Sequence, residues 1–186
     1  GFYINGNIGL GHERLSIIDL GDAARQPMSN EDGRYWIVLN GEIYNYLELR
    51  QGLIGKGHKF KSHSDTEVVL HLYEDNGPDC LNRLNGIFAF AIWDNHEKTL
   101  FAARDHFGVK PFYYTLQNGS FSFASEIKAF FHYGLLKPEL CQKALSDYLT
   151  FQFCLGEKTL FKDVLKLLPG HYLFLKPDGS LTIYKY

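Results

Sequence analysis

Apolar runs separated by turn-forming residues recur along the second half of the chain. Segments 86–105, 111–125 and 170–186 each hold two apolar stretches around a short polar turn, and the second turn is Asn118-Gly119. Asn-Gly between apolar runs is typical of a type I′ hairpin turn. Because a short turn joins antiparallel strands whereas parallel strands need long crossovers, the pattern predicts mainly antiparallel sheets.

Apolar residues recur at helical spacing in three other segments, which are 43–54, 66–75 and 142–153. These spacings predict helices between the hairpins. Ser64 and Asp65 precede the second of them and fit the start of a helix.

The segment Ile87–Trp93 is apolar at every position, which indicates a strand covered on both faces. The expected fold class is therefore α+β, with two mainly antiparallel sheets inside and helices outside. The chain shows no repeat, low-complexity tract or linker, so we expect a single domain over residues 1–186.

Composition and charge exclude several classes of protein. The 186 residues are 45% hydrophobic and 22% charged, as in an ordinary globular domain. A net charge of -2 leaves no basic surplus for nucleic acid. The longest apolar runs reach about eight residues, short of the ~20 of a membrane-spanning helix. We therefore expect no nucleic-acid or membrane partner and a cytoplasmic location.

The metal-binding residue types do not form a recognisable motif. Cys80, Cys141 and Cys154 are odd in number and lack CxxC spacing, so we expect plain thiols. His58, His63 and His71 are five and eight residues apart, which does not place them on one helical turn. We expect solvated or hydrogen-bonded histidines and no metal site.

The triplet Asn40-Gly41-Glu42 follows the apolar run Tyr35–Leu39. One interpretation is a turn between strand and helix, with Asn-Gly forming the bend and Glu42 near the positive end of the helix dipole. The other is a ligand site that combines an amide donor, a backbone free of a side chain and a carboxylate. The triplet alone leaves both open.

Four segments together resemble a known family. Residues 9–20, 26–50, 64–94 and 103–114 resemble the class II glutamine amidotransferase domain of asparagine synthetases, in family order over nearly the whole chain. The resemblance implies a four-layer αββα sandwich of the N-terminal-nucleophile hydrolase type. It also implies hydrolysis of glutamine to glutamate and ammonia.

The resemblance assigns roles to five residues. Asn40, through its side-chain amide, and Gly41, through its backbone N–H, would form the oxyanion hole. Glu42 and Asp65 would share the α-ammonium of glutamine, and Arg14 would bind its carboxylate, for which the planar guanidinium is suited.

Structural alternatives remain for Arg14 and Asp65. Arg14 could be a surface residue paired with Glu13, and Asp65 could cap the helix that begins at Thr66. In the matching segment 104–111, the charges of Arg104, Asp105 and Lys110 could brace the rim of the site, contact a partner domain or hold the loop together.

One feature departs from the family pattern. Class II glutaminases use the thiol and free amine of an N-terminal Cys, whereas this sequence starts with Gly1-Phe2 and its three cysteines are internal. A fragment, a degenerate domain, or a leader outside this stretch would each explain the difference. We expect residues 1–186 alone to hydrolyse no glutamine.

Two functions therefore stand. The first is the glutaminase domain of an asparagine synthetase, with glutamine as substrate and a C-terminal synthetase domain as partner. This domain would need no cofactor, and ATP and Mg²⁺ would act in the synthetase domain. The second is a non-catalytic glutamine-binding or scaffold domain of a related ATP-dependent synthetase. Loss of a first strand would expose a sheet edge and favour association, for example as a homodimer.

Overall fold

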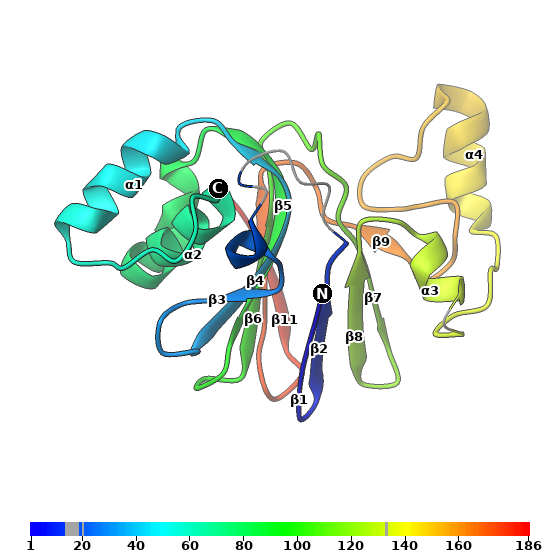
Figure 1. Cartoon of the computed structure of the whole chain (residues 1–186). Coiled ribbons are helices and arrows are strands. Elements are labelled where there is room, and N and C mark those ends of the chain that lie inside the picture. Colours follow the sequence, from blue (N-terminus) through cyan, green and yellow to red (C-terminus); the bar gives the residue numbers. More distant parts are fainter. Residues whose placement is uncertain (14–18, 20, 133) are drawn as a thin grey trace.

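The computed structural model of the chain describes residues 1–13, 19, 21–132 and 134–186 (Figure 1). The strands are β1 (Phe2–Asn5), β2 (Ile8–Gly11), β3 (Met28–Ser29), β4 (Tyr35–Ile43), β5 (Gly86–Asp94), β6 (Thr99–Arg104), β7 (Tyr113–Gln117), β8 (Ser120–Ala124), β9 (Leu165–Lys166), β10 (His171–Leu175) and β11 (Leu181–Lys185). The helices are α1 (Tyr46–Gly55), α2 (Asp65–Asn76), α3 (Lys128–His132) and α4 (Gln142–Phe151), with 3-10 segments η1 (Asp22–Ala24) and η2 (Gly77–Arg83).

All strand pairs are antiparallel. The large sheet has the order β11-β10-β6-β5-β4-β3, a second sheet has the order β8-β7-β9, and β1 pairs with β2. Helices α1 and α2 lie on one side of the large sheet, and the second sheet lies on the other side, with α3 and α4 beyond it (Figure 1). The predicted α+β arrangement of two antiparallel sheets between helices is confirmed.

The three predicted hairpins are present as β5–β6, β7–β8 and β10–β11. Asn118 and Gly119 between β7 and β8 have φ angles of 52° and 77°. Positive φ at both central residues is the signature of a type I′ turn. The type I′ turn predicted at Asn118-Gly119 is therefore confirmed.

The predicted start of the first helix is wrong. Helix α1 begins at Tyr46, whereas Ile43 is the last residue of β4 and pairs with Gly86 of β5. The N–H of Ile43 donates to Asp65 Oδ2 at 2.9 Å. These tertiary contacts extend the strand over residues that helical spacing assigned to the helix.

The other two helices match their predictions closely. Helix α2 starts one residue early, and its N-cap Ser64 accepts a hydrogen bond from the N–H of Thr66 at 3.1 Å. Helix α4 ends at Phe151, two residues early, because Gln152 takes a left-handed φ of 65°.

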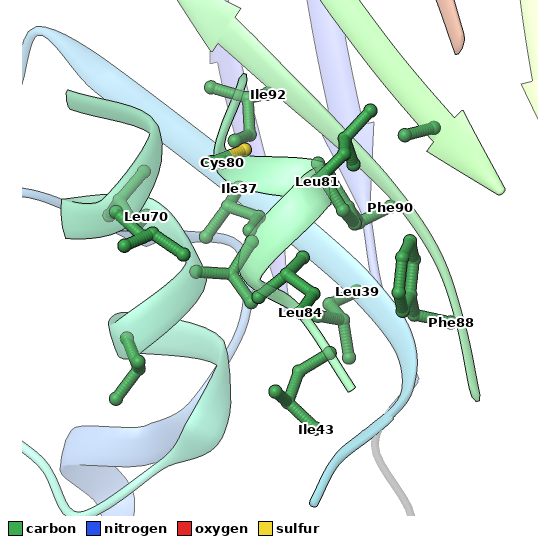
Figure 2. Close-up of a cluster of buried hydrophobic side chains, with 14 of the residues drawn as sticks. Ile37, Leu39, Ile43, Leu70, Cys80, Leu81, Leu84, Phe88, Phe90 and Ile92 are labelled. Carbon is green, nitrogen blue, oxygen red and sulfur yellow. The ribbon is translucent and has the colours of Figure 1, made fainter. Parts of the chain in front are cut away.

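Strand β5 is buried on both faces, as its sequence indicates. Alternate side chains pack under α1 and α2 in one hydrophobic core or between the sheets in the other. The first core contains Phe88, Phe90 and Ile92 (Figure 2), and the second contains Ala89, Ala91 and Trp93.

The loop after β6 is held by its own charged residues. The buried carboxylate of Asp105 accepts hydrogen bonds from backbone N–H groups, those of Phe88, Phe107, Val109 and Lys110. The guanidinium of Arg104 donates to the carbonyl oxygens of Gly108, Lys110 and Leu167. Of the alternatives that the sequence left open, the structural role therefore applies to Arg104 and Asp105.

Within the described ranges of the chain, no helix has both the length and the apolar character required to cross a bilayer.

A charged pair links the residue before β4 to the end of β5. Arg34 Nη2 lies 2.8 Å from Asp94 Oδ2, and Arg34 Nε donates to both carboxylate oxygens. Asp94 also accepts from the N–H groups of His96 and Glu97. Burial acts to raise the pKa of Asp94, but these hydrogen bonds outweigh it and the pKa is lowered.

We predict that Asp94→Asn lowers the free energy of unfolding at pH 7 by about 1.5–3 kcal/mol, because a charge-assisted pair is lost. Since the pKa of Asp94 is lower in the folded than in the unfolded chain, the carboxylate stabilises the fold above about pH 4. Its contribution disappears as pH falls through the lowered pKa. Urea unfolding across pH should show wild type and variant converging in acid. Asp178→Asn, in the exposed β10–β11 turn, is the control and should change little.

Candidate functional site

A large cavity of about 1190 Å³ lies between the two main sheets. Apolar side chains of the inter-sheet core form much of its wall, including Val38, Ala89 and Phe112. Asn40 is a polar residue on the same wall. A mainly apolar hollow with a few placed polar groups is the usual form of a small-molecule site.

The strand alternation of β4 decides which residues of the triplet face this cavity. Leu39 and Ile43 belong to the core beneath the helices, whereas Val38 belongs to the core between the sheets. Asn40 and Glu42 are two and four residues beyond Val38, so they share its face of the strand. The structure thus places the predicted amide donor and the predicted ammonium acceptor on one side of β4.

The triplet lies within β4 and not in a turn. The alternative in which Asn-Gly forms the bend between strand and helix is therefore wrong. Asn40 pairs with Ala89, and Glu42 pairs with Ile87. The amide of Asn40 donates from Nδ2 to Ser125 Oγ, beyond the end of β8, at 3.1 Å.

Gly41 is required by the neighbouring strand. Its φ is 150°, and a Cβ at this position would lie 2.1 Å from the carbonyl oxygen of Ile87 and 2.7 Å from Phe88 Cα. The resemblance explained this glycine by the approach of a substrate to the backbone. The structure adds a second reason for glycine, because the backbone of β5 occupies the space that a Cβ on residue 41 would need.

Side chains replace a neighbouring strand along the outer edge of β4. Strand β3 pairs with β4 only at Trp36 and Ile37. Beyond it, Gln26 contacts both backbone groups of Leu39, as acceptor at 2.6 Å and donor at 3.3 Å. Asp65 accepts from Ile43 further along.

The direction of the Gly41 N–H follows from these contacts. Backbone N–H groups of alternate residues point to the same side of an antiparallel strand. Since those of Leu39 and Ile43 point to the outer edge, the N–H of Gly41 points there too. No sequence pattern singled out Gln26, whose place inside the matching segment 26–50 is the signal that points to it.

Asp65 is the first residue of α2 and is buried, with 6% of its surface exposed. Its Oδ2 accepts from Ile43, and its Oδ1 accepts from the N–H of Thr66 at 2.9 Å. Asp65 therefore contacts the first turn of α2, as the capping alternative predicts, in addition to the N-cap contact of Ser64. The same contacts bring Asp65 to the end of β4, next to the residue that follows Glu42.

Arg14, the predicted ligand of the substrate carboxylate, lies outside the described residues. Its assigned role and the pairing of Glu42 with Asp65 around one ammonium stay predictions.

The cysteines are free thiols, as expected. Burial raises the pKa of Cys80 to about 12, so its thiolate is scarcely populated near neutral pH. Cys141 precedes α4 and Cys154 follows it, and Cys154 Sγ contacts the carbonyl oxygen of Ala144. Among the described residues that line the cavity, none is a cysteine.

We predict that Gly41→Ala destabilises the protein by at least about 2 kcal/mol, because backbone strain and overpacking each cost about 1–3 kcal/mol. The measurement is equilibrium unfolding in urea. The matched control is Gly52→Ala inside α1, where a Cβ would meet nothing within 4 Å. That control should be neutral or stabilising. Equal stability of Gly41→Ala and wild type would contradict the close contact with β5.

Comparisons with known proteins identify the family of the domain. A family model described as a glutamine amidotransferase domain matches residues 1–186. Asparagine synthetase [glutamine-hydrolyzing] 1 of Bacillus subtilis is 43% identical over 186 residues, which are 100% of this chain and 29% of that protein. Amidase chry2 of Gibberella zeae is 41% identical over 177 residues, covering 95% of this chain and 26% of that protein.

A solved structure resembles the fold. Glutamine phosphoribosylpyrophosphate amidotransferase from B. subtilis, complexed with ADP and GMP, superposes with a TM-score of 0.65 at 23% identity. The match covers 94% of this chain and 34% of that chain. This chain therefore spans only about a third or less of each protein compared, 29% in the case of the B. subtilis synthetase.

Proposed function

The chain belongs to the family of glutamine amidotransferase domains, and from that membership we propose that it is the glutaminase domain of an asparagine synthetase. In this proposal it hydrolyses glutamine to glutamate and delivers ammonia for the ATP-dependent amidation of aspartate. The observation that carries the proposal is the position of Asn40 and Gly41 on β4, where a side-chain amide borders the cavity beside an outward-pointing backbone N–H.

The chemistry requires a place for negative charge. In the proposed reaction, the α-amino group of the N-terminal Cys takes the thiol proton, and the thiolate attacks the amide carbon of glutamine to form a tetrahedral oxyanion. The C–N bond then breaks as the leaving nitrogen takes up that proton and departs as ammonia. Water hydrolyses the resulting thioester to glutamate and restores the thiol. Each fixed donor to the oxyanion contributes roughly 10²–10³ in rate.

Asn40 and Gly41 meet this requirement in the proposal. The Asn40 amide has two N–H bonds, and Ser125 accepts one of them. The other is left for the oxyanion. The N–H of Gly41 would be the second donor, and the contact of Gly41 with β5 holds the backbone in one conformation before substrate binds.

Binding of a free amino acid requires opposite charges for its ammonium and its carboxylate. We assign the ammonium to Glu42 and Asp65 and the carboxylate to Arg14. Asp65 is held by its hydrogen bonds from Ile43, Ser64 and Thr66, and Oδ2, which accepts from Ile43, has a second lone pair for an ammonium. Fixing the carboxylate in advance lowers the entropy cost of binding.

The nucleophile is placed outside the three cysteines of residues 1–186. Cys80 is buried with a raised pKa, and neither Cys141 nor Cys154 lines the cavity. The resemblance assigns this role to an N-terminal Cys of the mature protein.

The partner in this proposal is a synthetase domain within the same natural protein, which would activate aspartate with ATP and Mg²⁺. The relatives' greater length supports it, since the matched part is 29% of the B. subtilis synthetase. Free thiols agree with a reducing compartment, and we place the protein in the cytoplasm.

We predict that Asn40→Ala in the full natural protein lowers kcat for glutamine hydrolysis by about 10²–10³ with a smaller effect on KM, because the donor acts mainly when the oxyanion forms. Ammonia-dependent amidation of aspartate should survive. Glutamate release and asparagine formation are the measurements.

Ser125→Ala is the matched control, because it removes the partner of the Asn40 amide and keeps the amide itself. It should lower kcat far less than Asn40→Ala does. Unchanged glutamine hydrolysis in Asn40→Ala, with glutamine still bound in calorimetry, would instead favour a non-catalytic glutamine-binding domain.

A further prediction concerns the charged clamp, which is the set of Arg14, Glu42 and Asp65 assigned to the two charged groups of glutamine. Charge-assisted hydrogen bonds contribute about 1.5–3 kcal/mol each, so Arg14→Ala and Glu42→Gln should raise KM for glutamine roughly tenfold to a hundredfold. Asp65→Asn should also raise KM, but with some loss of stability, because Asp65 has hydrogen bonds within the fold. KM and melting temperature are measured together. Arg25→Ala is the control, since Arg25 lies in an exposed pair with Asp22. An unchanged KM in Arg14→Ala would refute the clamp.

A further inference from the structure

A cluster of two histidines and two glutamates lies outside the residues assigned to glutamine. Glu31 belongs to the turn between β3 and β4, His58 to the connection between α1 and α2, and His71 and Glu74 to α2 itself. Helix α2 packs on the face of the large sheet opposite the cavity (Figure 1). His58 and His71 are hydrogen-bonded, as expected, to Asp75 and Glu74. Their spacing does not place them on one helical turn, but the fold brings their rings to 4.7 Å.

The four possible ligand atoms lie within 4.8 Å of one another. His71 Nδ1 is 3.2 Å from Glu74 Oε2 and 3.7 Å from Glu31 Oε2, and His58 Nδ1 is 3.8 Å from Glu74 Oε2. Zinc binds such ligands at about 2.0–2.2 Å, so neighbouring ligand atoms of a tetrahedral site are ~3.4 Å apart. The observed separations are close to that value before any ion is present to draw the ligands together.

Both imidazoles present the same nitrogen to the cluster. In each ring Nδ1 faces the glutamates, while Nε2 faces a different carboxylate outside the cluster. His58 Nε2 is 2.9 Å from Asp75 Oδ1, and His71 Nε2 is 3.8 Å from Glu67 Oε1. Metal-ligating histidines usually fix their tautomer and ring orientation by a hydrogen bond of the kind that His58 makes. The contact of His71 with Glu67 is too long for a hydrogen bond and leaves Nε2 facing the carboxylate.

Both glutamates are also oriented by the surrounding chain. Glu31 Oε1 accepts from the N–H of Lys59 at 2.9 Å, and Glu74 Oε1 accepts from Asn30 Nδ2 at 3.1 Å. Each carboxylate therefore has one oxygen engaged and directs the other, Oε2, toward the histidines. His71 is almost fully buried, whereas Glu31 and Glu74 reach a small surface cleft of about 330 Å³ that would admit an ion.

We propose that Glu31, His58, His71 and Glu74 bind a divalent first-row transition-metal ion, with zinc as the preferred occupant. Two neutral imidazoles and two carboxylates suit zinc in both donor type and number, and the two carboxylates balance its charge. The ion would add a further link between the β3–β4 turn, the α1–α2 connection and α2, which hydrogen bonds already join. Its role is structural, since four protein ligands leave no open position for a substrate.

The site does not depend on the proposed glutaminase function, because it lies across the sheet from the cavity. Either proposal can fail while the other stands.

The test uses the full natural protein, stripped with a chelator and titrated with ZnCl₂ alone in a calorimeter. We expect one zinc per chain and a higher melting temperature for the domain when zinc is present. Loss of a residue that hydrogen-bonds to a metal ligand typically lowers metal affinity by about 10–100-fold. Asp75→Asn removes such a residue and should lower the zinc affinity within that range. Glu74→Gln and His58→Ala each remove a ligand and should lower the zinc affinity further.

His63→Ala is the matched control, because His63 is an exposed histidine on the same connection as His58. It should bind zinc as wild type does. Glu31→Gln covers the case in which a histidine variant fails to fold, since Glu31 is exposed. Circular dichroism verifies that each variant is folded.

The ¹⁵N NMR chemical shifts of the imidazole nitrogens give a readout that does not depend on affinity or stability. On zinc binding, Nδ1 of His58 and of His71 should show the shift of a metal-bound nitrogen, while Nε2 keeps its proton. The proposal is overturned if the stripped protein binds no zinc, if zinc binds through Nε2, or if folded Glu74→Gln and Glu31→Gln bind it as tightly as wild type and His63→Ala.

Discussion

The pairing of β4 with β5 is the constraint on which the rest of the structure depends. Nine residues of each strand pair in one register, and at Gly41 and Gly86 the backbones approach so closely that a Cβ on either strand would meet the other. A shift of one residue would move every side chain of β4 to the opposite face. The two glycines make such a shift costly, so they fix which residues face the cavity and which enter the core below the helices.

The large sheet thereby separates two regions of different chemistry. On the cavity side, Asn40 lines the mainly apolar cavity, and Glu42 lies two residues further along the same face of β4. On the helix side, α2 carries His71 and Glu74 toward the turn that precedes β4. The same helix begins with Asp65, whose carboxylate holds the end of β4. Helix α2 thus connects the proposed substrate clamp at its start with the proposed metal site nearer its end.

Polar side chains complete the backbone of β4 where strand partners stop. Gln26 bonds both backbone groups of Leu39, and Asp65 bonds that of Ile43. Buried backbone groups must be paired, and a full strand in this position would cover the N–H of Gly41. The side chains of His12, Gln26 and Asp65 contact the backbone of Leu39 and Ile43 in place of a strand, and the N–H of Gly41 is directed to the same edge.

The sequence by itself determined the hairpins, the two antiparallel sheets and the double burial of β5, because these depend on local turn chemistry and on the period of apolar residues. The family followed from the resemblance of four segments of the chain. The sequence also singled out Asn40, Gly41, Glu42 and Asp65, though the oxyanion and clamp roles stay predictions. Only the tertiary structure decided that Ile43 ends a strand, that β5 requires Gly41 to be glycine, and that Gln26 acts as a strand partner. Only the fold likewise joined Glu31, His58, His71 and Glu74, whose spacing in the chain had argued against a site. The physical reason is the same in each case: these contacts join segments far apart in sequence, and hydrophobic period and turn signals describe each segment alone.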